Sequence, residues 1–134
     1  MAHVLVVEDY ENLQLIYKTA LTEAGYKVDV TGDGLDALKL VDEHEPDLIL
    51  LDLLLPHMGG LEFLRAYDLG KHPQVKVIVF SNLFSPTLLE EAKQLGVVHY
   101  LTKADFTPQE LVDFVAKTLA DKTPRKEIDS KGQK

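Results

Sequence analysis

Short apolar runs alternate with segments of helical periodicity along this chain. The runs are His3–Val7, Lys27–Thr31, Asp47–Leu51, Val75–Phe80 and Val97–Leu101. Most of them are continuously apolar, which is typical of parallel strands covered on both faces, whereas half-exposed strands alternate apolar and polar residues. Strands that alternate with helices in this way predict an α/β fold with a parallel sheet.

The segments between the runs carry the signals of helices. The first has an apolar stripe at helical spacing, followed by Gly25, and glycine commonly stands just after the end of a helix. The stripe is Leu13, Ile16, Tyr17, Ala20, Leu21 and Ala24. A second helix is predicted to be capped by Asp33 and to end before Pro46. A third carries Leu61, Leu64 and Tyr67 on one face and is predicted to be closed by Gly70.

Two further helix starts combine a capping hydroxyl with a proline. Ser85-Pro86 predicts a fourth helix, which ends at Gly96. Thr107-Pro108-Gln109-Glu110 has the pattern of a capping box and predicts a fifth. The residues expected to face inward from it are Leu111, Phe114 and Val115.

Composition narrows the classes of function. With 134 residues, 46% of them apolar, the chain can form one domain with its own core. We predict a domain over residues 1–120 and a polar, disordered tail over 121–134, which could also begin a linker to another domain. The absence of cysteine excludes disulfides and thiolate chemistry and is compatible with a cytoplasmic location. The net charge of −8 argues against direct nucleic-acid binding, and no apolar run is long enough to span a membrane.

Polar residues follow four of the five predicted strands. They are Glu8 and Asp9 after the first, Asp52 after the third, Ser81 after the fourth and Lys103 just after the fifth. In a parallel sheet of strand order 2-1-3-4-5, ligands bind beyond the carboxyl ends of strands one and three, which are the strands that deliver carboxylates. Carboxylate oxygens suit Mg²⁺, and the lysine adds a positive charge.

Asp52 is the most informative of these residues. It interrupts a run of leucines, and a carboxylate in such surroundings is costly unless cations and hydrogen bonds compensate it. Each residue alone has an ordinary explanation: an aspartate that begins a turn, an acidic helix cap, a solvated lysine, a serine bonded to its own turn. Their joint placement favours phosphoryl chemistry. The five histidines show no metal-ligand spacing.

Over roughly residues 2–120 the chain resembles the receiver domain of two-component response regulators. The residues that carry the resemblance, in order and spacing, are Glu8-Asp9, Asp52 with Pro56 four residues later, Ser81, Tyr100 and Lys103. The resemblance implies a three-layer, doubly wound, flavodoxin-like fold with a five-stranded parallel sheet of order 2-1-3-4-5.

The resemblance further implies that Asp52 accepts a phosphoryl group from a sensor histidine kinase, a phosphotransfer protein or a small phosphodonor. Mg²⁺ (or Mn²⁺) would be bound by Asp9, Asp52, the backbone carbonyl of Leu54 and waters, one of them held by Glu8. The phosphoryl oxygens would be held by the Lys103 ammonium, the Ser81 hydroxyl and the backbone N–H groups of Leu53 and Asn82.

Ser81 and Tyr100 are, by the same resemblance, the switch residues. Their movement would reshape the face made by the fourth helix, the fifth strand and the fifth helix, for a downstream protein partner or for a homodimer. The chain would catalyse only its own phosphotransfer and dephosphorylation, and so would not be an enzyme in the usual sense.

Three positions depart from the usual pattern of the family. Asn82 stands where a small alanine or glycine is typical, Ala104 replaces the proline that usually follows the lysine, and Glu8 replaces an aspartate. A cis bond without proline costs about 2.5–4 kcal/mol, so we expect Lys103-Ala104 to be trans.

Leu54 and Leu83 stand two residues beyond Asp52 and Ser81 and flank the route of a water that would attack the phosphoryl group. Our hypothesis is that their apolar side chains restrict this water and prolong the phosphorylated state.

Other functions of the same fold make different demands on the sequence. An aspartyl-phosphate hydrolase would resemble D-x-D at the third strand, but Leu54 occupies the second acidic position. A mononucleotide or flavin binder would need a glycine-rich loop after the first strand, where acidic residues stand instead. A pseudo-receiver, which docks partners without phosphorylation, is the remaining alternative, and its support is Asn82 and Ala104.

Overall fold

The computed structural model describes residues 1–121, so the predicted tail beyond Asp121 lies outside the described residues. The strands are β1 (His3–Val7), β2 (Lys27–Thr31), β3 (Leu48–Leu51), β4 (Lys76–Phe80) and β5 (His99–Leu101). The helices are α1 (Glu11–Glu23), α2 (Gly34–Glu43), α3 (Gly60–Tyr67), α4 (Pro86–Gln94) and α5 (Pro108–Ala120). Two short 3₁₀ turns are η1 (Leu69–Lys71) and η2 (Lys103–Asp105).

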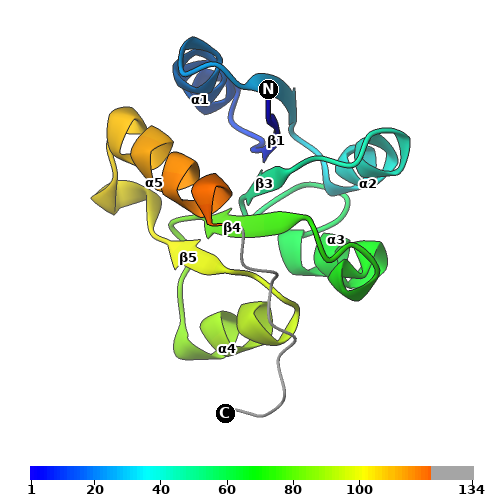
Figure 1. Cartoon of the computed structure of the whole chain (residues 1–134). Coiled ribbons are helices and arrows are strands. Elements are labelled where there is room, and N and C mark those ends of the chain that lie inside the picture. The colour runs from blue at the N-terminus through cyan, green and yellow to red at the C-terminus, as the bar shows by residue number, and fades with distance from the viewer. Residues whose placement is uncertain (122–134) are drawn as a thin grey trace.

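The strands form one parallel sheet in the order β2-β1-β3-β4-β5. Helices α1 and α5 pack on one face, and α2, α3 and α4 supply the core of the other (Figure 1). This arrangement confirms the predicted three-layer, doubly wound fold and its strand order. The carboxyl ends of β1 and β3 therefore lie side by side.

The apolar strands supply a core on each face of the sheet. In β1, Val4 and Val6 face the α1–α5 side, whereas Leu5 and Val7 face the α2–α3 side. Because side chains alternate between the two faces of a strand, a sheet covered on both faces needs apolar residues at every position. This requirement explains the unbroken apolar runs in the sequence.

The predicted helix ends are largely confirmed. Side chains of Asp33, Ser85 and Thr107 accept hydrogen bonds from the first turns of α2, α4 and α5. Glu110 completes the capping box of α5. Gly25 and Gly96 have φ of +101°, a left-handed conformation that glycine adopts without steric cost.

Several details of the prediction were wrong. Helix α3 ends at Tyr67, and Asp68, not Gly70, takes the left-handed conformation there, with φ of 62°. Aspartate tolerates this conformation better than most residues. Strands β3 and β4 begin one residue later than predicted, and β5 begins two residues later. Ile16 and Ala24 are exposed, because the covered face of α1 is narrower than the apolar stripe.

Two glycines allow close packing around the segment that follows β3. A Cβ atom at Gly34, the first residue of α2, would collide with the backbone carbonyl oxygen of Met58. At Gly60, the first residue of α3, a Cβ atom would lie 2.6 Å from the carbonyl oxygen of Asp52. The two helix starts therefore hold the β3–α3 segment in place.

We predict that Gly34→Ala destabilises the protein by about 1–3 kcal/mol, because the new methyl group meets backbone that must shift. Helix propensity alone predicts the opposite, a gain of about 0.5–1 kcal/mol. The free energy of unfolding in urea measures the effect. Gly70→Ala is the matched control, since its Cβ would meet only the side chain of Asp68, at 3.3 Å. Equal effects of the two substitutions would contradict the packing argument.

Candidate functional site

The parallel sheet fixes the backbone of the candidate site residues. Beyond the end of β1, the N–H of Glu8 donates to the carbonyl of Thr31 at 2.9 Å. Beyond the end of β3, the N–H of Asp52 donates to the carbonyl of Val7 at 3.0 Å. Sheet hydrogen bonding therefore continues one residue past each strand and holds both acidic residues at the carboxyl edge.

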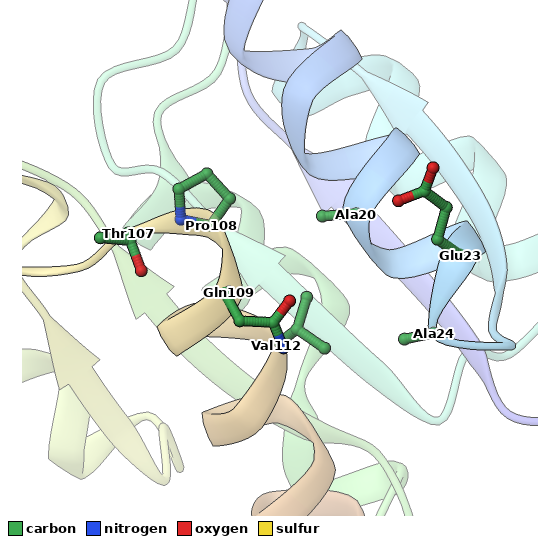
Figure 2. A pocket seen from close by; sticks show the side chains of 7 residues that line it. All are labelled: Ala20, Glu23, Ala24, Thr107, Pro108, Gln109 and Val112. Atoms are coloured by element: carbon green, nitrogen blue, oxygen red, sulfur yellow. The ribbon is translucent and has the colours of Figure 1, made fainter.

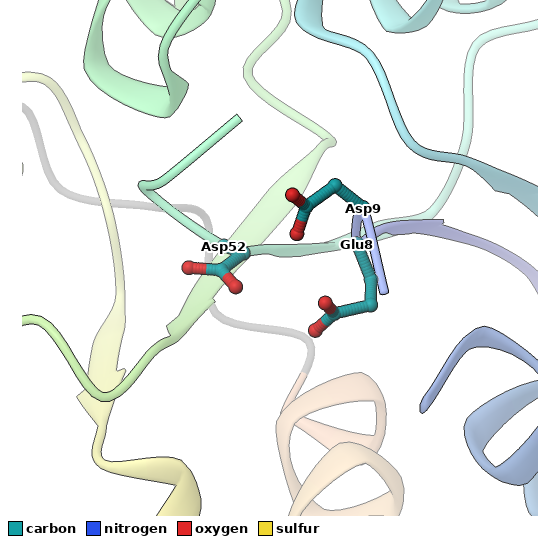
Figure 3. A group of neighbouring side chains, drawn as sticks. All are labelled: Glu8, Asp9 and Asp52. Carbon is teal, nitrogen blue, oxygen red and sulfur yellow. The ribbon is translucent and has the colours of Figure 1, made fainter. Parts of the chain in front are cut away.

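Three carboxylates converge at this edge. Glu8, Asp9 and Asp52 each offer an oxygen atom, and these atoms all lie within 4.8 Å of one another (Figure 3). Glu8 and Asp52 are only 3% and 7% exposed, whereas Asp9 is exposed. Like charges this close repel, and burial strengthens the repulsion because water screens it less.

Lys103 compensates part of this charge. Its ammonium donates to Oδ2 of Asp52 at 2.6 Å and to Oε1 of Glu8. Burial by itself lowers the pKa of Lys103, but the hydrogen bonds and charges of Asp52 and Glu8 outweigh it and raise the pKa above its ordinary value. The lysine is therefore charged at neutral pH, between two buried carboxylates.

The other oxygen of Asp52 is held by two donors. Ser81, which is fully buried, donates its hydroxyl to Oδ1 at 2.7 Å, and the N–H of Leu54 donates to the same oxygen at 3.2 Å. Within residues 1–121, no hydrogen bond is found for the backbone N–H of Leu53 or Asn82. Both groups therefore remain candidates for the phosphoryl contacts that the resemblance implies.

The donor set suits a divalent cation. Three carboxylates and one ammonium leave the cluster negative, and no hydrogen bond or ion pair to the Asp9 side chain is found among the described residues. Hard oxygen ligands of this kind suit Mg²⁺ and Mn²⁺. This is the one metal-competent cluster found in residues 1–121, and it contains no histidine.

Tyr100 is connected to the cluster through the loop after β4. The N–H of Leu83 donates to the Ser81 hydroxyl oxygen at 3.1 Å, and the Tyr100 hydroxyl donates to the Leu83 carbonyl. Burial, and secondly the charge of Asp52, raises the pKa of Tyr100. The ring of Phe84 packs edge-to-face on the ring of Tyr100, with 5.4 Å between the ring centroids. The sequence did not predict this contact, because a single aromatic residue in a loop has no periodic signal.

The two leucines near Asp52 and Ser81 are open to solvent. Leu54 is 60% exposed and Leu83 is 37% exposed, although their backbone N–H groups bond to Asp52 and Ser81. Their side chains therefore lie at the surface beside the acidic cluster. The peptide bond between Lys103 and Ala104 is trans, as expected.

A separate hollow of about 560 Å³ lies between α1 and α5 (Figure 2). Its lining residues are Ala20, Glu23, Ala24, Thr107, Pro108, Gln109 and Val112. The lining contains one carboxylate and no cationic side chain, and it shares no residue with the acidic cluster. The hollow therefore lacks a cation like the Lys103 ammonium of the acidic cluster.

Comparison with known proteins identifies the family. Residues 4–116 match the response regulator receiver domain. The chain belongs to this family. Receiver domains are signalling modules of two-component systems and not classical enzymes.

None of the helices in residues 1–121 of this receiver domain combines the length and the apolarity that a membrane crossing needs.

Relatives of this receiver domain differ in length. It is 29% identical over 116 residues to sporulation initiation phosphotransferase F of Bacillus subtilis, covering 87% of this chain and 92% of that protein. It is 36% identical over 98 residues to the luminescence regulatory protein LuxO of Vibrio campbellii, covering 73% of this chain but only 21% of LuxO. Among solved structures, the Francisella response regulator 1452 receiver domain aligns with a TM-score of 0.81 and 28% identity, over 92% of this chain and 100% of that one.

We predict that Lys103→Met destabilises this receiver domain by about 3 kcal/mol, because it leaves two buried carboxylates without their cation. The pKa of Lys103 is raised from 10.5, so its stabilising contribution is fully present below 10.5 and is lost as the pH rises through the raised value. Urea unfolding of both proteins at neutral and strongly alkaline pH measures the difference. A difference that does not shrink at alkaline pH would contradict the charge pairing.

Proposed function

We propose that this receiver domain is a phosphorylation switch in which Asp52 accepts a phosphoryl group. The observation that carries the proposal is the set of donors around one buried carboxylate: the Lys103 ammonium, the Ser81 hydroxyl and the Leu54 N–H. Such donors also suit the oxygens of a phosphoryl group. The name of the Bacillus subtilis relative, a phosphotransferase, supports the same chemistry.

In the proposed reaction, a carboxylate oxygen of Asp52 attacks the phosphorus atom of the donor. The new O–P bond forms as the bond to the leaving group breaks, and the leaving group keeps the electron pair of that bond. The leaving atom is a histidine nitrogen of a sensor kinase or phosphotransfer protein, or an oxygen of a small acyl phosphate. The product is an acyl phosphate on Asp52.

Residues of this chain would orient the transferred group. Lys103 would pair with one phosphoryl oxygen, and the Ser81 hydroxyl and the N–H groups of Leu53 and Asn82 would donate to the others. Asp9, Asp52 and the Leu54 carbonyl would hold Mg²⁺ or Mn²⁺, with Glu8 acting through a water. The cation would supply positive charge that offsets the repulsion between the carboxylate nucleophile and the phosphoryl group.

Phosphorylation would change the surface through the loop after β4. The single charge of the Asp52 carboxylate would be replaced by the charge of about −1.5 to −2 on the phosphoryl group, whose oxygens would offer Ser81 new acceptors. A shift of Ser81 would move Leu83, and with it the acceptor of the Tyr100 hydroxyl. The face formed by α4, β5 and α5 would then favour a downstream protein or a second copy of the chain.

We predict that acetyl phosphate with Mg²⁺ adds the mass of one phosphoryl group to the protein and that Asp52→Asn abolishes the addition. The amide of asparagine has no carboxylate oxygen to attack phosphorus. Intact-protein mass spectrometry measures the change, and omission of the metal should prevent it. Absence of any addition to the wild type would favour the pseudo-receiver alternative, in which the domain docks partners without phosphorylation.

We also predict that a combined Leu54→Asn and Leu83→Glu variant loses its phosphoryl group severalfold faster than the wild type. The leucine side chains are apolar and flank Asp52, whereas amide and carboxylate groups can hydrogen-bond a water that attacks phosphorus. The decay of the phosphorylated protein, followed by mass spectrometry, measures the rate. Leu15→Asn, at an exposed leucine of α1, is the control. An unchanged lifetime of the double variant would refute the hypothesis.

A further inference from the structure

We propose that the Asn82 side chain is a positioning residue for Lys103. Its amide oxygen accepts a hydrogen bond from the N–H of Ala104 at 2.9 Å and so holds the turn that begins with Lys103. The inference rests on the proposed function, because it concerns how the lysine is presented to the transferred phosphoryl group.

The bond lies where the pairing of β4 and β5 ends. The N–H of Ser81 donates to the Leu101 carbonyl at 3.1 Å, and the N–H of Lys103 donates to the Ser81 carbonyl at 3.3 Å, near the upper limit for such a bond. The next N–H along the chain, that of Ala104, donates to the side-chain oxygen of Asn82, whereas the N–H of Lys103 donates to a backbone carbonyl. The Asn82 side chain therefore joins the β4–α4 loop to the turn η2, which starts at Lys103.

The donor of this bond lacks a partner within its own turn. The first N–H groups of a helical turn have no acceptor inside that turn, and Ala104 is the second residue of η2. Asn82 is exposed, so its amide could instead be solvated. The Asn82 amide oxygen instead accepts from the Ala104 N–H, so the Asn82 side chain caps the turn η2 from a neighbouring loop.

The two bonded residues are also two of the three positions at which the chain departs from the common receiver pattern. A proline at position 104 would have no N–H to donate, and a small residue at position 82 would have no side-chain acceptor. Each departure thus supplies one half of the bond. We infer that they compensate one another, so that Lys103 keeps its place without the proline.

The bond should affect the rate of phosphorylation more than the fold. A solvent-exposed hydrogen bond contributes little to stability, but the long, flexible Lys103 side chain must hold its ammonium on both Asp52 and Glu8. Small displacements of a catalytic group are costly to rate. An anchor on each side of Lys103, at its own N–H and at that of Ala104, limits such displacements.

The test is the rate at which acetyl phosphate with Mg²⁺ phosphorylates Asp52 in four proteins: wild type, Asn82→Ala, Ala104→Pro and the double variant. Asn82→Ala keeps the backbone N–H at position 82 and is expected to slow the reaction by about two- to tenfold, the equivalent of one hydrogen bond. In the Ala104→Pro background, where the N–H is gone, it should have no further effect. A second pair of proteins, Lys103→Met with and without Asn82→Ala, should likewise show no effect of the Asn82 substitution.

Two further measurements separate this role from a general loss of structure. Hydrogen exchange of the Ala104 amide should become faster in Asn82→Ala, while the urea midpoint stays unchanged. Gln74→Ala, which truncates an exposed amide side chain before β4, is the matched control for rate and exchange.

The possible outcomes are distinct. A wild type that takes no phosphoryl group would overturn the proposed function, and the role of Asn82 with it. If the wild type is phosphorylated, an unchanged rate in Asn82→Ala would overturn only the inference. A faster rate would do the same, since it would show that the side chain obstructs the phosphodonor. Equal slowing by Asn82→Ala with and without the Ala104→Pro substitution would also reject the inference.

Discussion

The site depends on the ammonium group of Lys103, which lies between the buried carboxylates of Asp52 and Glu8. Two buried negative charges side by side are costly, and the lysine reduces that cost without removing it, because Asp9 adds a third negative charge. The remaining negative charge makes the cluster attractive to a divalent cation. The same balance explains why an anionic phosphoryl group would need a cation to approach Asp52.

The sheet makes this arrangement possible. Parallel pairing of β1 with β3 brings Asp52 beside Glu8 and Asp9, although more than forty positions separate them in the chain. Helices on both faces bury the strands, so the side chains at the carboxyl edge are held on a rigid base. The loops after β3, β4 and β5 then supply Leu54, Ser81 and Lys103 to one carboxylate.

Much of this could be predicted from local patterns. Unbroken apolar runs indicate buried parallel strands, and the caps at Asp33, Ser85 and Thr107 mark helix starts, because both depend on residues close together in sequence. The end of α3 was mispredicted because glycine is only the commonest left-handed residue, and Asp68 adopts that conformation instead. Ile16 belongs to the apolar stripe of α1 but is exposed, because periodicity does not indicate how wide the covered face of a helix is.

The sequence by itself determined which residue types stand at the carboxyl ends of the strands, and so the family. Only the tertiary structure decided which atoms meet: Ser81 on one oxygen of Asp52, Lys103 on the other, and the Asn82 side chain on the Ala104 N–H. The physical reason is that periodicity and capping report the face and the ends of an element. A hydrogen bond between two loops depends instead on how strands distant in sequence are brought together.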